Sequence, residues 1–331
     1  MSDIRYSSER GKKKKMILII EKIVSIFLIM ALGFFANRIG VLPKESNDVL
    51  TNVLIKIITP CMLISSITSK KLSDDTVSAT IQIFCGGLIF FIVCAFISFI
   101  LSKYVFHIKE DEVGTYAFTL GSINSGFMGF PVTLALFGSE ILYFMVIHNI
   151  TLTVYMYSFG PVILAAGHGR KSSFNWHPFL KSFLNINTIV SFISIIMLFA
   201  GLHLPSFLFD TVESVGDATV PISMLLVGLQ LGQSNPMEIL KNGKMVALSL
   251  IKMLTFPVLT FLAVNWLPLA TSVKVCLVFA AVFPAAVATA PIVSLEGKDP
   301  VPSAEMIAFT TLVSVATIPL FAALITAYYN L

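Results

Sequence analysis

Two apolar segments of this chain, 160 residues apart, are interrupted in the same way by glycine, proline and small residues. The first reads GSINSGFMGFP from Gly121 to Pro131, and the second reads PAAVATAP from Pro284 to Pro291. The offset is 160 positions both from Asn124 to Pro284 and from Pro131 to Pro291. Because an unpaired backbone group in hydrocarbon costs several kcal/mol, such a break persists only where it lines a cavity or the protein interior. A matched pair of breaks in two chain halves is typical of the binding site of a transporter.

The composition requires lipid as the solvent. The chain has 331 residues, of which 56% are hydrophobic and 12% are charged, whereas a soluble domain is about 25% charged. A hydrocarbon core about 30 Å thick needs roughly 20 apolar residues per helix. Ten segments meet this need: 16–37, 47–68, 77–102, 113–137, 141–166, 184–202, 207–232, 244–266, 272–294 and 303–329. We therefore predict an all-α integral membrane protein with ten transmembrane helices.

The two halves of the chain repeat. Pro60 and Pro221 are 161 positions apart, and Pro43 and Pro205 are 162 apart, close to the offset of the broken segments. Five spans per repeat is an odd number, so the second half enters the membrane from the opposite side, which gives an inverted repeat with helices 4 and 9 broken and crossing. The predicted parts are a basic tail at 1–15, a first repeat at 16–167, a central loop at 168–183 and a second repeat at 184–331.

The basic residues predict an orientation in the cell membrane. Most lysines and arginines between the segments fall in the odd-numbered connections, whereas the even-numbered ones hold only Lys70, Lys71 and Lys274. The positive-inside rule then places the odd connections in the cytoplasm and both termini outside. The run Lys12–Lys15 argues for the reverse, and we interpret it with the hypothesis that translation starts at Met16.

The first break has the residue types of an anion site. Where a helix restarts within the membrane, its first N–H groups are unpaired and its dipole places about half a positive charge there. Such an end binds anions without a charged side chain. Gly126 and Gly129 permit close backbone approach, Pro131 suits the first turn of the restarting helix, and Asn124 and Ser125 can cap the helix or bind a ligand.

In the second break, Pro284 and Pro291 bracket small residues that leave room for a ligand, and Thr289 is the nearest polar group. The predicted substrate-binding residues are Asn124, Ser125, Gly126, Gly129, Pro131, Pro284, Thr289 and Pro291. The alternative is a pair of kinked, packed helices with no ligand.

Charged residues inside the spans are functional candidates because they are costly in lipid. Lys56 lies one helical turn before Pro60, and Asp217 lies one turn before Pro221. We expect both to face the interior, as an ion pair or as gates beside the site. The alternative is that each reaches to the membrane interface.

Three further polar residues lie within spans. Lys252 in segment eight can attract an anionic substrate, neutralise a carboxylate or serve a structural role. His148, beside Asn149 in segment five, can carry protons near neutral pH or be a packing residue. No histidine or cysteine spacing indicates a metal site, and no HExxH, GxSxG or Walker A motif is present, so we expect no cofactor and no enzyme. The scattered basic residues do not suggest nucleic-acid binding.

Several motifs in chain order resemble the auxin efflux carrier family. They are the opening Ile26–Leu42, Ile123–Val132, Val220–Gly228, a basic residue and proline at Lys252 and Pro257, and Glu296–Asp299. The resemblance implies a fold similar to the bile acid/sodium symporter superfamily, with segments 1, 2, 6 and 7 as a scaffold and the other segments as a transport domain that moves like an elevator. It also implies small organic anions as substrates, such as auxin or dicarboxylates, and a possible homodimer. The sodium-binding acidic residues of the bile acid carriers are not recognisable here.

We therefore predict a secondary transporter or uniporter for a small carboxylate such as malate, malonate or an auxin-like acid. The alternatives are a carrier of a neutral or cationic metabolite, and a membrane-embedded receptor that binds a ligand without moving it.

Overall fold

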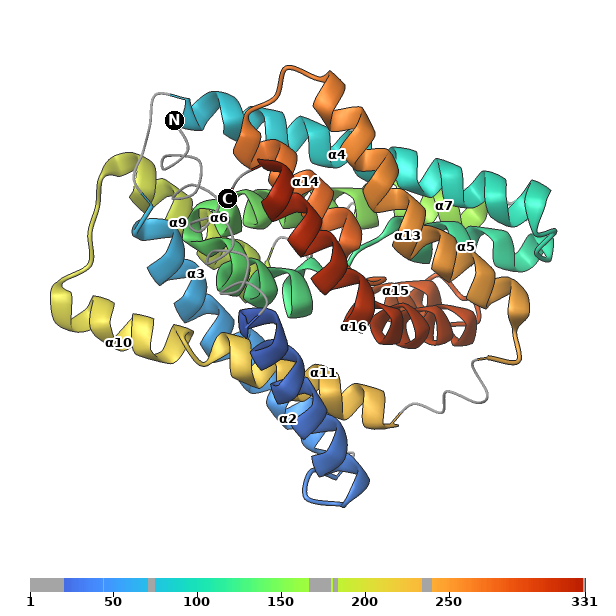
Figure 1. The fold of residues 1–331 in the computed structure, drawn as a ribbon, viewed down its shortest axis with the longest axis horizontal. Helices are drawn as coiled ribbons and strands as arrows, with labels where there is room; N and C mark the ends of the chain where they lie inside the picture. The colour runs from blue at the N-terminus through green and yellow to red at the C-terminus, as the bar shows by residue number, and fades with distance from the viewer. Residues whose placement is uncertain are drawn as a thin grey trace, which may run out of the picture.

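The computed structural model describes residues 21–43, 45–70, 75–166, 180, 184–233, 240–329 and 331. Within these residues the regular structure is entirely helical (Figure 1). A helix at 21–38 comes first. The elements that follow are α2 (Ser46–Val53), the π-helix η1 (Leu54–Ile58), α3 (Thr59–Thr68), α4 (Thr76–Ile100), the π-helix η2 (Leu101–Val105), α5 (Glu110–Gly121), the π-helix η3 (Ser125–Gly129), α6 (Phe130–Ser158), α7 (Gly160–Ala165), α9 (Ile186–Ala200), α10 (Ser206–Gly216), α11 (Thr219–Gln233), α13 (Gly243–Trp266), α14 (Thr271–Val282), α15 (Thr289–Leu295) and α16 (Val301–Tyr329). The predicted tail at 1–15 and most of the predicted loop at 168–183 lie outside the described residues.

The helices have the length and composition of membrane spans. Six stretches of the described chain are long and apolar enough to cross a bilayer: Ser46–Thr68, Thr76–Val105, Glu110–Ser158, Ser206–Gln233, Gly243–Trp266 and Val301–Tyr329. Two shorter apolar helices, α9 and α14, accompany them. The prediction of an all-α integral membrane protein is therefore confirmed, whereas the count of ten spans remains a prediction.

The stretch Glu110–Ser158 does not run straight. It contains 49 residues, which as one helix would extend roughly 74 Å, more than twice the thickness of the hydrocarbon core. Two interruptions divide it. Extended backbone at Ser122 separates α5 from η3, and Gly138 inside α6 has φ 75°, in the left-handed region that favours glycine. The chain therefore changes direction twice within this stretch.

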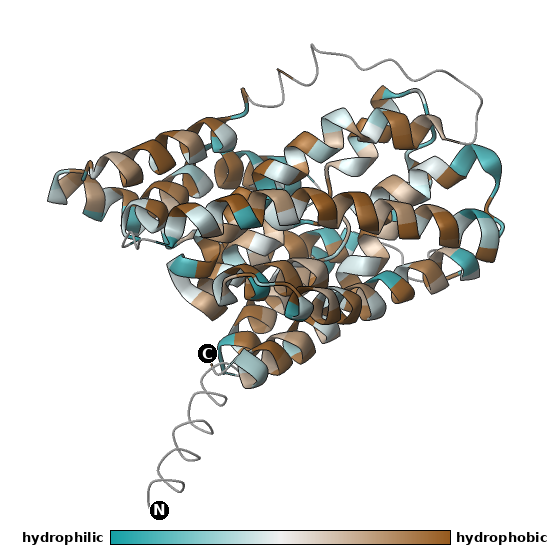
Figure 2. Cartoon of the chain, turned by 90° about the horizontal axis from the view of Figure 1, so that it is seen from above, coloured by the Kyte–Doolittle hydropathy of each residue, from teal (hydrophilic) through white to brown (hydrophobic). Residues whose placement is uncertain are grey.

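The outer surface of the bundle is apolar, as lipid requires. Large hydrophobic side chains such as Leu28 and Leu32 in the first helix, and Phe192 and Ile196 in α9, are exposed. Figure 2 shows hydrophobic residues along the helices and hydrophilic residues gathered mainly near helix ends and turns.

The helices form two packing groups (Figure 1). In one group, α3 packs against α9 and α10, and the helix at 21–38 packs so closely on α11 that a Cβ built on Gly228 would overlap the carbonyl oxygen of Met30. In the other group, α4 packs against α5 and α6, and α13 packs against α14 and α16. The groups meet where α11 contacts η3 and α6, next to the interrupted segments.

Candidate functional site

The two interrupted segments contact each other. The backbone N–H of Asn124 in the first break donates a hydrogen bond to the carbonyl oxygen of Pro284 in the second, at 2.8 Å. Both breaks follow a helix that ends in extended backbone, with ψ 151° at Ser122 after α5 and ψ 148° at Phe283 after α14. The breaks predicted from glycine and proline are therefore real and are joined directly.

The first break leaves N–H donors free. The Oδ1 atom of Asn124 accepts a hydrogen bond from the N–H of Phe127 at 3.2 Å, and the carbonyl of Asn124 accepts one from Gly129 at 2.9 Å. The hydroxyl of Ser125 donates to Oδ1 of Asn149 at 2.5 Å. In the described structure the N–H groups of Ser125 and Gly126 donate no hydrogen bond to the backbone of another element. These are the first-turn donors that every helix start leaves unpaired.

The first residues of the second break are paired with other helices. The Nζ atom of Lys252 donates to the carbonyl of Phe283 at 2.7 Å, so a cation caps the C-terminal end of α14. The N–H of Ala285 donates to Oγ1 of Thr310 at 3.0 Å. These two bonds and the bond from Asn124 pair three backbone polar groups between Phe283 and Ala285, which stabilises the extended backbone inside the bundle.

Thr289 stabilises the second break on the side away from the pocket. Its Oγ1 atom donates to the carbonyl of Ala286 at 2.7 Å and shares a hydrogen bond with Oγ of Ser303 at 3.0 Å. Ser303 in turn shares a hydrogen bond with Oγ1 of Thr119 at 2.9 Å. Thr289 is fully buried, so it connects α15 to α16 and α5 and does not line the pocket at the breaks.

A pocket of about 500 Å³ lies at the contact between the two breaks, within the size range of small-molecule sites. Its polar lining comes mainly from Asn124, Ser125, Asn149 and Asn185, and Gly126 and Ala286–Ala288 contribute small residues. The side-chain oxygens of Asn124 and Asn149 already accept internal hydrogen bonds. Their amide NH₂ groups therefore remain as donors, beside the free N–H groups of the restarting helix. Among the described residues that line this pocket none is acidic, so its chemistry suits an oxyanion.

The other residues predicted for this site lie outside the pocket lining. Gly129, Pro131 and Pro284 are buried around the breaks, and Pro291 is exposed on α15. Their role in the structure is to shape the backbone. Pro131 lies near the start of α6, which continues directly from η3, so the helix that restarts at Ser125 has already formed before this proline and the expectation of a first-turn position is corrected.

His148 and Asn149 are neighbours with different surroundings. His148 is fully buried, with ring centroids 4.7 Å from Phe91 and 5.5 Å from Phe90 of α4. Neither of its ring nitrogens has a hydrogen-bond partner in the described part of the chain. The packing interpretation of His148 therefore fits this geometry, and Asn149 is the polar residue that lines the pocket.

Lys56 and Asp217 do not meet in the interior. Lys56 is exposed on the π-helix η1, and Asp217 is exposed at the turn between α10 and α11. No ion pair joins them in the described structure. The structure therefore differs from the expectation that they face inward as a pair.

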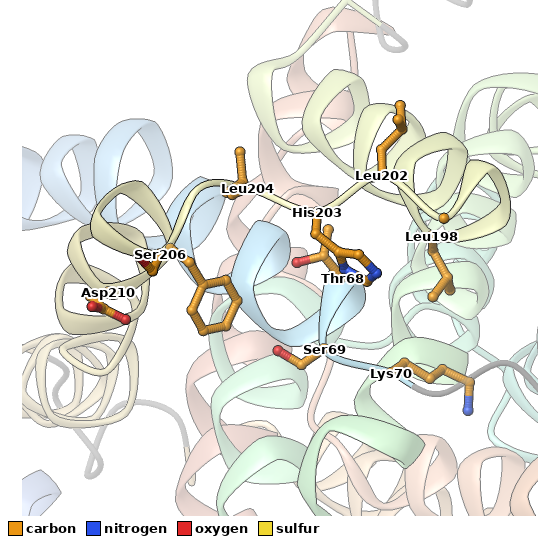
Figure 3. A pocket seen from close by; sticks show the side chains of 11 residues that line it. Thr68, Ser69, Lys70, Leu198, Leu202, His203, Leu204, Ser206 and Asp210 are labelled. Atoms are coloured by element: carbon orange, nitrogen blue, oxygen red, sulfur yellow. The ribbon is translucent and has the colours of Figure 1, made fainter.

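A second pocket, of about 720 Å³, lies at the end of α3 and the turn between α9 and α10 (Figure 3). Lys70 and Asp210 lie on opposite sides of it. The Nζ atom of Lys70 lies 5.2 Å and 5.0 Å from the ring centroids of Tyr143 and Phe144. Partial burial lowers the pKa of Lys70, and the nearby carboxylate of Glu140 opposes that shift. The start of α10 at Ser206 lies at this pocket, whereas no interrupted membrane helix is among the described residues that line it.

Sequence reasoning did not find several residues that hold the site together. Ser303, Thr310 and Thr119 are hydroxyl residues of ordinary apolar helices, and nothing in their spacing shows which carbonyl or N–H they reach. Asn185 had a recognisable signal, since it directly precedes an apolar run and caps α9 by accepting from the N–H of Thr188 at 3.0 Å.

An all-helical membrane protein with two interrupted helices joined at a pocket has the features of the membrane transporter class. A family model described as "Membrane transport protein" matches residues 18–176 and 173–322. The chain therefore belongs to this family, the auxin efflux carrier family.

Three relatives show the same relationship. An uncharacterized transporter of Methanocaldococcus jannaschii is 29% identical over 220 residues, which cover 63% of this chain and 68% of the relative. An uncharacterized transporter of Methanothermobacter thermautotrophicus is 26% identical over 155 residues, which cover 46% of this chain and only 50% of the relative. The uncharacterized transporter YfdV of Escherichia coli is 20% identical over 216 residues, with 63% and 67% covered.

Proposed function

We propose that this protein is a secondary transporter or uniporter that moves a small organic anion across the membrane by alternating access. The observation that carries the proposal is the group of N–H donors at the pocket between the breaks. The oxygens of Asn124 and Asn149 each accept an internal hydrogen bond, and the N–H groups of Ser125 and Gly126 lie at the start of a helix. A carboxylate supplies only acceptors when ionised, so it matches these donors, whereas a cation finds no carboxylate among the described lining residues.

The proposed architecture is ten spans in two inverted repeats. The two helices before the breaks, α5 and α14, each contain 12 residues and begin 161 positions apart (271 − 110). This agrees with the offset of the prolines in the sequence. The two packing groups support a further proposal, in which the group holding α5, α6, α14 and α15 moves relative to the group holding α3, α9, α10 and α11.

Counterflow in proteoliposomes tests the function. Purified protein is reconstituted, the vesicles are loaded with an unlabelled compound, and uptake of the same labelled compound is followed. Malate, malonate and indole-3-acetate form the anionic panel, with a neutral amino acid as the uncharged comparison. We expect exchange of at least one carboxylate. Binding of label without exchange would identify a receptor, and exchange of the amino acid alone would favour the neutral-metabolite alternative.

A matched pair of variants ties the exchange to the pocket. Asn149→Leu removes a donor and the partner of Ser125, and it should reduce exchange by about tenfold or more, since a hydrogen bond to a charged group contributes about 1.5–3 kcal/mol. Asn52→Leu changes an exposed asparagine of α2 that bonds only within its own helix, and it should leave exchange unchanged. Equal activity of the two variants would remove the pocket from the proposal.

A further inference from the structure

Lys252 is an unusual residue in this bundle. It is 1% exposed, and among the described residues it is the only lysine, arginine, aspartate or glutamate that is buried. Its Nζ atom donates to the carbonyl of Phe283 at 2.7 Å and lies 3.9 Å from Sδ of Met253. No carboxylate lies within ion-pair distance of it in the described structure. The bundle therefore holds a deeply buried lysine that has no acidic partner.

Capping alone does not explain this lysine. Removing a cation from water and leaving it without a counter-ion is strongly unfavourable. The dipole of α14 offsets part of that cost, since a helix C-terminus corresponds to about half a negative charge. An uncharged amide donor would satisfy the Phe283 carbonyl at a lower desolvation cost. The hydrogen bond to Phe283 therefore does not require a positive charge at this position.

Lys252 contacts the backbone segment that leads into the pocket lining. The carbonyl that it binds belongs to Phe283, and the next residue, Pro284, accepts the hydrogen bond from Asn124 at the edge of the pocket. Ala286–Ala288, a few residues further along the same extended backbone, line the pocket. Lys252 thus lies outside the pocket lining and contacts the backbone of the second break, a few residues before the part of it that lines the pocket.

We propose that Lys252 is the fixed counter-charge that makes the pocket selective for anions. The proposal rests on the proposed function and names the residue that determines its charge specificity. Lys252 acts on the substrate through its electrostatic field, across the backbone of the second break, and does not touch the substrate. A bound carboxylate supplies the negative charge that the protein itself lacks there. Because Lys252 is buried, its field is screened less than that of a surface charge, and a pair of unit charges about 10 Å apart at an effective dielectric constant of about 20 changes an affinity roughly tenfold.

Three substitutions separate the charge from the cap. Lys252→Gln keeps a donor for the Phe283 carbonyl and removes the charge, Lys252→Met removes both, and Lys252→Arg keeps the charge. Lys70→Gln, which removes a lysine outside the breaks, is the control. Equilibrium binding to purified protein is measured for malate, malonate, indole-3-acetate and the uncharged dimethyl ester of malonate.

We expect Lys252→Gln and Lys252→Met to weaken binding of every carboxylate that the unmodified protein binds by about tenfold or more. Lys252→Arg and Lys70→Gln should stay within about threefold of the unmodified protein, and binding of the ester should not change with any variant. A purely structural cap would give the opposite pattern, with Lys252→Gln unchanged and Lys252→Met losing carboxylate and ester alike. That pattern overturns the proposal and leaves the proposed function intact.

The unmodified protein supplies a second test that does not depend on the folding of any variant. Malonate, its monomethyl ester and its dimethyl ester form a series with two, one and no negative charges. With a fixed counter-charge, affinity should fall by roughly tenfold when the last charge is removed. Equal affinities along the series overturn the counter-charge alone. If the protein binds none of malate, malonate and indole-3-acetate, the proposed function fails together with the counter-charge.

Discussion

Gly126 offers the sharpest test of the pocket, because a single methyl group can be added there without disturbing the fold. The residue is exposed at the pocket, and a Cβ built on it meets no heavy atom within 4 Å. Its φ is not positive, so alanine can adopt its backbone conformation. Gly126→Ala should therefore leave the protein folded and, by lowering the entropy of the unfolded chain, as stable or slightly more stable by about 0.5–1 kcal/mol.

The same methyl group should weaken ligand binding. It projects beside the free N–H groups of Ser125 and Gly126, where a carboxylate oxygen would have to come within about 2.9 Å of the nitrogen. Displacing the ligand from one charged hydrogen bond costs about 1.5–3 kcal/mol, which corresponds to roughly a 10- to 150-fold loss of affinity. The prediction is thus a variant with undiminished stability and much weaker binding.

The assay combines thermal unfolding in detergent with equilibrium binding of malate, malonate and indole-3-acetate. Gly243→Ala is the matched control, because Gly243 is also exposed and its built Cβ also has no neighbour within 4 Å, but it lies at the start of α13. If Gly126→Ala binds the carboxylates as tightly as Gly243→Ala does, the free donors of the first break do not hold the ligand and the reasoning is wrong.

Three further predictions concern the framework around the site. Thr289→Val removes the hydroxyl that bonds to Ala286 and Ser303, so it should lower the free energy of unfolding by about 1–3 kcal/mol in a thermal unfolding assay. The control is Thr255→Val, at an exposed threonine with a similar local bond, which should lower it by less than half as much. Gly228→Ala places its Cβ against the backbone of the first helix and should destabilise the protein by about 1–3 kcal/mol, and melting at the temperature of Gly243→Ala would contradict that close packing. Asn185→Ala removes the cap of α9, and thermal unfolding should show a loss of about 0.5–2 kcal/mol.

The positions of the two breaks could be predicted from sequence because glycine and proline act locally on the backbone. Asn124, Gly126 and Pro131 signal an interruption and restart whatever surrounds them. The partners of the break could not be predicted, since the pairing of Lys252 with the carbonyl of Phe283 depends on how α13 packs against α14. The number of spans stays a prediction, because a broken span is not recognised by helix length: α14, with 12 residues, is too short to cross a bilayer as one straight helix.

The orientation of Lys56 shows a different limit. Counting one helical turn back from Pro60 assumes 3.6 residues per turn, but Lys56 lies in the π-helix η1, where each hydrogen-bonded turn contains an extra residue. The face that a residue presents shifts accordingly, and Lys56 is exposed. Asp217 lies at the turn between α10 and α11, where a helical count no longer applies.

The hydrogen bond from Asn124 to Pro284 has a mechanical consequence. It joins one half of the chain to the other at a buried position. Separating the two breaks there would leave the N–H of Asn124 and the carbonyl of Pro284 without partners. If the pocket is to face the two sides of the membrane in turn, its walls must travel as one piece. The sliding surface must then lie elsewhere, where α11 and α3 touch α6, and substitutions along that seam should alter the speed of the cycle while leaving affinity untouched.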